Sequence, residues 1–277
     1  MIRKIIKNKQ AFIGLVMISF IVTIAVFAPA IATNDPMKVD VVNKFQNISS
    51  EYPLGTDQLG RCVYSRLVYG ARYSLGIAIP ILLIISILSI IIGTSIAYIG
   101  GIVDRIFIGI CDILMAFPPL VVLLALVGAL GQGILNLVIA MILSMWAWYA
   151  KIVRSYVLVE KNKDYIASAR IAGSTDIKVI FKHIIPNVLP SLIVFFSMGI
   201  GSMILMISGF SFLGMGVEAG RPEWGAMLSG AKQYIYSRPY MIFYPGFCIL
   251  FTVAGFNLFG EALRDITSSK QEVYKNE

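Results

Sequence analysis

Six apolar stretches alternate with polar segments along the chain. A helix crosses the hydrocarbon core of a bilayer with about 20 apolar residues, so each stretch predicts one membrane-spanning helix. The predicted spans are residues 11–32, 74–99, 106–130, 135–150, 188–210 and 241–260. The pattern therefore predicts an all-α membrane protein with six transmembrane helices, and an even number of spans places both termini on the same side.

The longest polar segment in the second half of the chain, residues 164–190, predicts two short helices joined by a turn. Residues 165–172 are rich in small, helix-forming side chains. Gly173 follows at the position where helices often end in a left-handed residue. Ser174 and Thr175 are typical N-cap residues for the next helix.

The second of these helices is predicted to carry an apolar stripe and to be stopped by Pro186, which lacks a backbone donor. The stripe consists of Ile177, Ile180, Phe181 and Ile184, at helical spacing. A polar hairpin beside a membrane suits the docking of a protein partner. The same spacing is also typical of an ordinary amphipathic cytoplasmic loop, and the pattern alone does not separate these two interpretations.

Composition and charge agree with a membrane location. The 277 residues are 58% hydrophobic and only 14% charged, whereas soluble domains carry about 25% charged residues. Of the 23 Lys and Arg residues, 15 fall at the termini or in segments on the same side. Because basic residues gather on the cytoplasmic side, both termini and residues 151–187 are expected there, with residues 36–73 outside. The same bias explains the net charge of +8, so no nucleic-acid partner is expected.

Two features inside the third span are candidates for a transport pathway. Pro118 belongs to a Phe-Pro-Pro sequence, which breaks the helical hydrogen-bond ladder. The break predicts either a bend that lines a path or a simple packing kink. Asp112 is costly at its depth in the membrane, so it marks a pathway or is solvated or paired, with Arg105 as the expected partner.

Three further segments have aromatic or apolar patterns. Leu67, Val68 and Tyr73 predict a short interfacial helix that leads into the second span. Trp146, Trp148 and Tyr149 are interpreted as an aromatic belt at the membrane interface rather than a ligand cage. Residues 211–240 combine glycines with large apolar groups, which favours a re-entrant or interface-hugging segment over a free loop.

The sequence contains no pattern of its own for catalysis or for a bound cofactor. It has no Gly-Lys pair, so an ATP-binding P-loop is absent. The single histidine, His183, cannot form a metal cluster, and the three cysteines predict neither a disulfide framework nor a zinc site. Residues 11–32 are long enough to anchor the chain, so no cleavable signal peptide is expected. We predict that this chain is not an enzyme.

Several segments resemble a known family. Ser168-Ala169, Gly173 and Pro186 within residues 164–190 resemble the EAA loop of permease subunits in bacterial ABC importers. Further segments resemble the dipeptide, oligopeptide and nickel permease group: residues 54–57, 60–61, 65–66, 70–72, 117–118, 211–214, 222–225, 256–258 and 263–265. The resemblance covers nearly the whole chain and implies the type I ABC importer permease fold with a cytoplasmic coupling hairpin at residues 164–190.

Within that group the chain is most similar to the C-type subunit of nickel importers, chiefly through residues 143–150. Three positions depart from the common family pattern. Ala167 stands where the EAA loop often has its glutamate, and Cys62 replaces a usual aspartate. Ile207 replaces a glutamate common in peptide-type members, which weakens the peptide interpretation.

The resemblance implies partners and residue roles. A sister permease would complete a heterodimer, two ATP-binding subunits would bind and hydrolyse ATP, and an extracytoplasmic solute-binding protein would deliver cargo in a cell membrane whose lipid surrounds the spans. We divide the chain into residues 1–73, an N-terminal helix with its outer loop, and residues 74–277, the permease core. The expected ATPase-coupling residues are Tyr165, Ser168, Ala169, Gly173, Ile184 and Pro186. The expected pathway residues are Asp112, Pro118 and Ile207.

The cargo predicted from the resemblance is nickel or a metal chelate, and the alternative is a di- or oligopeptide. Since no histidine lies within a span, nickel is expected to cross as a chelate or through weak contacts. Two functions from other classes are a secondary transporter and a membrane scaffold. A secondary transporter usually shows internal repeats and functional intramembrane charges, and this sequence shows no repeat and no charge relay beyond Asp112. A membrane scaffold leaves the hairpin at residues 164–190 unexplained.

Overall fold

The computed structural model of the chain describes residues 8–218 and 220–273, with side chains to residue 266. Its elements, over these residues, are all helical, apart from one isolated bridge between Thr56 and Cys62. Among the described residues, five helices are long and apolar enough to cross a membrane. Two further helices, Gly101–Met115 and Pro119–Leu130, meet at an 80° bend, and they add a sixth span if they are counted as one. The predicted all-α membrane class is confirmed.

The element bounds are as follows. The α-helices are α2 (Lys9–Ile31), α3 (Val63–Ile99), α4 (Gly101–Met115), α5 (Pro119–Leu130), α6 (Ile134–Lys161), α7 (Asp164–Ile171), α8 (Asp176–Lys178), α9 (Ile185–Phe212), α10 (Trp224–Ala231) and α11 (Tyr240–Val273). Two short 3-10 helices, η1 (Val41–Asn43) and η3 (Lys232–Tyr234), lie in the loops. A π-helix, η2 (Val179–Ile184), joins α8 to α9.

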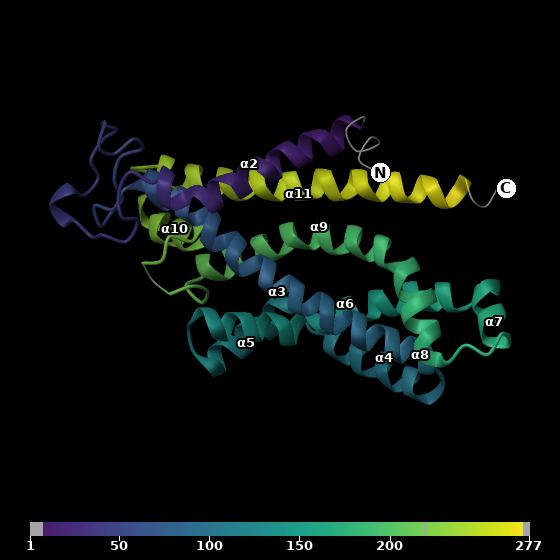
Figure 1. The fold of residues 1–277 in the computed structure, drawn as a ribbon. Coiled ribbons are helices and arrows are strands. Elements are labelled where there is room, and N and C mark those ends of the chain that lie inside the picture. Colours follow the sequence, from purple (N-terminus) through teal and green to yellow (C-terminus); the bar gives the residue numbers. More distant parts are fainter. Residues whose placement is uncertain (1–7, 219, 274–277) are drawn as a thin grey trace.

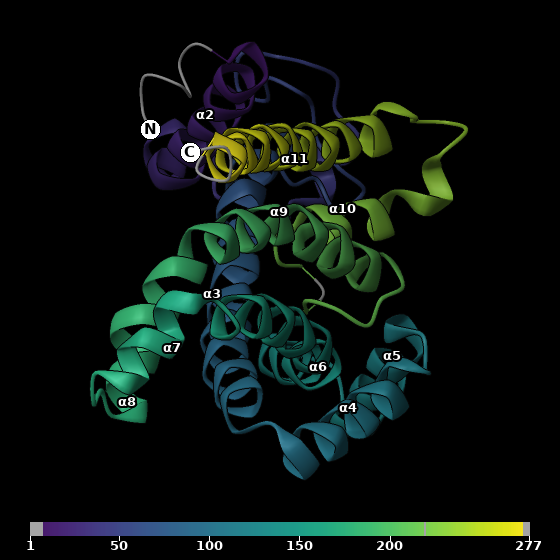
Figure 2. The ribbon, with the colours of Figure 1, turned by 90° about the vertical axis from the view of Figure 1, so that its right-hand side faces the viewer.

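The helices cross the molecule side by side. In Figure 2, α2 and α11 lie at one edge, α4 and α5 at the other, and α3, α6 and α9 between them. Glycines permit close approach at two of the packed pairs. A Cβ atom on Gly93 of α3 would lie 2.6 Å from the carbonyl oxygen of Ala150 on α6. A Cβ atom on Gly14 of α2 would lie 2.6 Å from the backbone nitrogen of Phe259 on α11.

Two helices extend beyond the spans predicted from apolar residues. α3 has 37 residues and begins at Val63, so Leu67 and Val68 are buried in its first turns and form no separate interfacial helix. α6 continues past Ala150 to Lys161. The length of an apolar stretch indicates only the part of a helix that lies in the hydrocarbon core. The helix itself continues beyond the core wherever the protein shields or pairs its polar residues. The predicted domain boundary after residue 73 lies within α3 and stays a prediction.

The two ends of the molecule differ in structure. Figure 1 shows the α2–α3 loop and α10 at one end, and α7 with α8 at the other, toward which the start of α2 and the end of α11 also lie. The predicted interface-hugging segment contains α10, whose Trp224 is fully buried and donates from Nε1 to the carbonyl oxygen of Leu67 at 3.1 Å. The segment is therefore packed against α3 rather than free.

Candidate functional site

The first helix of the hairpin, its turn and the start of its second helix have the local structure that the sequence predicts. α7 is followed by Gly173, whose φ of +83° lies in the left-handed region that glycine tolerates best. The side chain of Thr175 accepts from the backbone nitrogen of Lys178 at 3.4 Å and so caps α8. The predicted turn and cap are confirmed.

Pro186 does not end the second helix, and that prediction is wrong. The helical winding continues from Asp176 through the π-helix η2 into α9 and ends at Phe212. Pro186 occupies the first turn of α9, where the winding changes from π to α. A proline is tolerated in the first turn of an α-helix because the N–H that it lacks would have no partner within that helix. The second helix of the hairpin and α9 therefore form one continuous helical segment, from Asp176 to Phe212.

The predicted apolar stripe separates into a buried part and an exposed part. Ile184 is fully buried with Val179 and Ile166, which attach the hairpin to α3 and α6. At the tip, Ile177 and Phe181 are 71% and 68% exposed, and Ile171 of α7 is 87% exposed. We call Ile171, Ile177 and Phe181 the tip triad. Three large apolar side chains exposed at the end of one hairpin suit a protein partner.

Of the remaining predicted coupling residues, Ser168 and Ala169 lie on α7, Gly173 lies in the turn and Pro186 lies in the first turn of α9. Ser168 is exposed, and its hydroxyl donates to the carbonyl oxygen of Asp164 at 3.0 Å. Ala169 is half-buried, whereas Gly173 and Pro186 are exposed. A Cβ atom at Gly173 would meet no atom within 4 Å, so backbone conformation rather than space selects glycine there.

Tyr165 connects the hairpin to α6. Its hydroxyl donates to the carboxylate of Glu160, which also pairs with Lys163 at 2.8 Å. Asn187 donates to the Tyr165 oxygen at 3.1 Å and to the carbonyl oxygen of His183 at 2.6 Å. Burial, and then the neighbouring Glu160, raise the pKa of the Tyr165 phenol, so it stays protonated and keeps donating.

A second anchor connects the hairpin to α3. The Tyr98 hydroxyl donates to the carboxylate of Asp176, and the Arg170 guanidinium lies 5.1 Å from the centre of the Tyr98 ring. Glu160 of α6 and Tyr98 of α3 were not singled out by the sequence, because both lie outside residues 164–190 and only the tertiary fold brings them to the hairpin.

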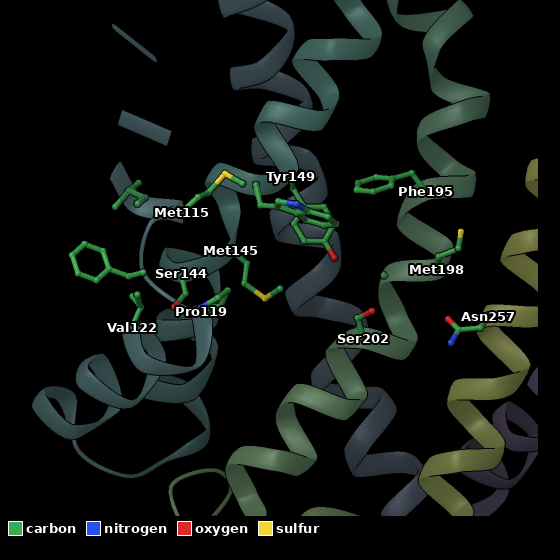
Figure 3. A pocket seen from close by; sticks show the side chains of 14 residues that line it. Met115, Pro119, Val122, Ser144, Met145, Tyr149, Phe195, Met198, Ser202 and Asn257 are labelled. Carbon is green, nitrogen blue, oxygen red and sulfur yellow. The ribbon is translucent and has the colours of Figure 1, made fainter. Parts of the chain in front are cut away.

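An apolar cavity of about 550 Å³ lies between α4, α5, α6, α9 and α11 (Figure 3). Its lining consists of Leu114, Met115, Phe117, Pro119, Val122, Ser144, Met145, Trp148, Tyr149, Phe195, Met198, Gly199, Ser202 and Asn257. Its polar side chains come from Ser144, Tyr149, Ser202 and Asn257, and none of these carries a charge. Such a lining can enclose an apolar or neutral ligand and orient it with a few hydrogen bonds.

The interpretation of the tryptophan-tyrosine sequence as an interfacial belt is wrong for two of its residues. Trp148 and Tyr149 line the cavity, with ring centres 4.8 Å apart, and both pack against Phe195 of α9. Tyr149 is only 1% exposed. The helix continues beyond these residues, and the cations that follow form ion pairs with α4: Lys151 with Asp112, and Arg154 with Asp104.

The three predicted pathway residues lie in different places. Asp112 is outside the cavity lining and pairs with Lys151 at 2.5 Å, so the expected pairing with Arg105 is wrong. Pro118 lies at the 80° bend between α4 and α5, where the adjacent Phe117 and Pro119 line the cavity. Ile207 is fully buried in the core, so none of its side chain is available to a cargo in this conformation.

Within the described residues, no group of three or more His, Cys, Asp or Glu side chains is arranged to hold a metal ion. The cavity offers the thioethers of Met115, Met145 and Met198. Thioethers are soft ligands, whereas Ni²⁺ suits imidazole and other nitrogen ligands. The cavity lining therefore lacks the nitrogen ligands that a bare Ni²⁺ ion prefers.

Comparison with known proteins gives consistent matches along the chain. Residues 85–273 match the family described as "Binding-protein-dependent transport system inner membrane component". Residues 1–48 match the "N-terminal TM domain of oligopeptide transport permease C". These two matches together cover most of the sequence.

Three curated relatives illustrate the range of similar proteins. The nickel transport system permease protein NikC of Escherichia coli (strain K12) is 38% identical over 91% of both chains. The metal-staphylopine import system permease protein CntC of Staphylococcus aureus (strain Mu50) is 38% identical over 95% of this chain and 91% of its own. The dipeptide transport system permease protein DppC of Alkalihalophilus pseudofirmus is 36% identical over 96% of this chain and 88% of its own.

The Tyr165 anchor generates a test of local stability. Tyr165→Phe removes the donor to Glu160 and leaves that buried carboxylate with Lys163 alone. We expect amide hydrogen exchange across residues 164–190 to be roughly tenfold faster in nanodiscs, with an unchanged melting temperature for the whole protein. Tyr156→Phe is the matched control, because Tyr156 is exposed on α6. Equal exchange in both variants would show that the anchor does not hold the hairpin.

Proposed function

The chain belongs to the family of inner membrane components of binding-protein-dependent transport systems, and from this premise we propose how it works in an ATP-driven importer. It is the membrane permease subunit and not itself an enzyme. Neither a secondary transporter nor a scaffold would account for this membership. In our proposal, two partner subunits bind and hydrolyse ATP, and this chain converts their movement into opening and closing of a path.

The hairpin is the proposed contact with an ATP-binding subunit. The observation that carries the proposal is the exposed tip triad, Ile171, Ile177 and Phe181, on a hairpin held to the membrane helices by Tyr165 and Tyr98. The apolar tip offers a surface on which a partner can dock. The hydrogen bonds of Tyr165 and Tyr98 hold the hairpin in one orientation relative to the membrane helices. A docked partner can therefore move the hairpin as a unit.

Movement of the hairpin would reach the cavity through α9. The helical segment is continuous from Asp176 to Phe212, and it contributes Phe195, Met198 and Ser202 to the cavity lining. Because a helix transmits displacement along its axis, a shift at the tip changes the shape of the cavity. Two arrangements of the permease pair, open to opposite sides, are the bistable element that such a shift would bias.

Nickel, as a metal chelate, is the proposed cargo. The nickel and metal-staphylopine permeases among the relatives support it, and the uncharged, aromatic cavity is compatible with a charge-compensated complex. A di- or oligopeptide is the alternative, supported by the dipeptide permease relative. A free peptide has charged ends, and the cavity provides no charged side chain to pair with them.

The proposed assembly has a sister permease beside this chain and a solute-binding protein at the α10 end. Both termini and the hairpin are proposed to be cytoplasmic. Two observations support this orientation. The sequence has 15 basic residues in the segments expected on the cytoplasmic side. The start of α2 and the end of α11 also lie toward the same end of the molecule as α7.

Cysteine labelling tests the orientation. In intact cells, a membrane-impermeant maleimide is expected to label Asn47→Cys in the α2–α3 loop but not Ile171→Cys at the tip, since both positions are exposed on opposite ends. Permeabilised cells should show labelling of both. The native chain is the control, since Cys62 and Cys111 are buried and Cys248 is half-buried. Labelling of Ile171→Cys from outside in intact cells would reverse the proposed topology.

Substitution of Gly173 tests coupling. Gly173→Val places a β-branched residue at a φ of +83°, so the turn should distort and uptake should fall at least about tenfold, with normal membrane levels. Gly173→Asn is the matched control, because asparagine adopts the left-handed region readily and should keep most of the uptake. Wild-type uptake and wild-type ATPase co-purification in Gly173→Val would argue against the hairpin as the contact.

A deletion strain tests the cargo. In cells without other uptake systems, deletion of this subunit is expected to abolish accumulation of nickel supplied with a chelator and to leave growth on a required dipeptide unchanged. Complementing the deletion strain with the Trp148→Ala variant should recover little uptake. Complementing it with Trp146→Ala should recover most of the uptake, because Trp146 is outside the cavity lining. Normal metal accumulation with lost dipeptide growth in the deletion strain would establish the peptide alternative.

A further inference from the structure

A second cleft lies away from the cavity, between α3 and the start of α6. It is an open groove of about 540 Å³, lined by Tyr69, Arg72, Tyr73, Gly76, Ile77 and Ile134. It shares no lining residue with the apolar cavity. Five of its six residues come from two and a half turns of α3, near the α10 end of the molecule. We call it the α3 groove.

The depth of the α3 groove follows from the sequence of α3. From residue 75 to residue 99 the helix carries no charged side chain, and at ~1.5 Å per residue this stretch is long enough to cross a hydrocarbon core of ~30 Å. Arg72 precedes this stretch by less than one turn, at the level of the lipid headgroups. Tyr69 and Tyr73 are amphipathic aromatic residues of the kind enriched at that level. Gly76 and Ile77 lie deeper.

Arg72 differs from the neighbouring arginines in having no protein partner among the described residues. Arg61 and Arg66 are buried and pair with Asp57 at 2.7 Å and 3.6 Å. Arg221 pairs with Glu218 at 3.4 Å and donates to the Tyr73 oxygen at 3.3 Å. Arg72 is exposed, and no ion pair or hydrogen bond engages its guanidinium. Because Tyr73 accepts from Arg221, its own hydroxyl hydrogen stays free to donate.

An apolar strip continues from the groove into the membrane. Gly76 has no side chain, and a Cβ atom there would meet nothing within 4 Å, so the floor of the groove is open. Further along the same helix, Ile79, Leu83, Ile87 and Ile91 are all exposed. They follow one another at four-residue spacing and therefore share one face of α3. The strip begins at the depth of the headgroups and leads into the hydrocarbon.

We propose that the α3 groove binds an anionic phospholipid of the leaflet at the α10 end. The phosphate accepts from the Arg72 guanidinium and from the Tyr73 hydroxyl, as planar donors on arginine suit phosphate oxygens. One acyl chain lies over Gly76 and follows the strip from Ile79 to Ile91. Charge complementarity selects the anionic lipid, because the groove contains one positive side chain and no carboxylate.

Native mass spectrometry of the intact permease complex in detergent tests the proposal. The probes are a phosphatidylglycerol and a phosphatidylcholine with the same acyl chains. Arg72→Gln should lower phosphatidylglycerol occupancy about fivefold, because one basic residue near the surface contributes about 1 kcal/mol and about 1.4 kcal/mol is tenfold. Phosphatidylcholine occupancy should not change. Lys38→Gln, an equal charge change in the exposed α2–α3 loop, is the control.

A second variant separates the acyl-chain contact from charge. A Cβ atom at Gly76 meets no atom within 4 Å, so Gly76→Leu should extend into the open floor of the groove and displace the lipid while the complex stays assembled. Gly109→Leu on α4 is its control, since a Cβ atom there also meets nothing within 4 Å. Wild-type phosphatidylglycerol occupancy in both Arg72→Gln and Gly76→Leu overturns the proposal. Loss of the sister subunit from both variants, with lipid occupancy unchanged, would instead make the groove a subunit interface and equally overturn it.

Discussion

The packing of α3 against α6 is the interaction on which the rest of the structure depends. Gly93 permits it, because any larger residue would place its Cβ atom against the carbonyl of Ala150. At one end, Lys161 of α6 donates to the carbonyl oxygens of Ala97 and Tyr98, the last turn of α3, and so joins the two helix ends that anchor the hairpin. At the other end, the α3 groove lies between the same two helices.

Two ion pairs and a small apolar cluster hold α4 against α6. Most of its apolar side chains are exposed, and only Phe107 and Cys111 are buried. Two ion pairs, Asp104 with Arg154 and Asp112 with Lys151, hold it against α6. Charged groups inside a membrane protein are costly unless paired, so these four side chains favour one arrangement of the two helices. These ion pairs lie outside the cavity lining, yet they help to position the cavity wall that Met115 and the bend form.

Helix α9 links the three regions to which the proposed function assigns a role. It begins at the hairpin, contributes Phe195, Met198 and Ser202 to the cavity, and reaches α10 near its end. There the buried carboxylate of Glu223 accepts from the Ser208 hydroxyl at 3.3 Å and from two backbone nitrogens at the start of α10. A displacement of α9 would therefore move the hairpin, the cavity wall and α10 together, as the proposed alternating access requires.

The sequence by itself determined the membrane class, five of the crossing regions and the Gly173 turn, because hydrophobic length and backbone preference act locally. Only the tertiary structure decided that Tyr149 faces a cavity, that Asp112 pairs with Lys151 and that Pro186 sits within a continuous helix. Apolar side chains that face lipid, protein or a cavity look alike in a sequence of this kind. Which of the three each one meets depends on contacts between helices that are far apart in the chain, and a single sequence does not contain those contacts.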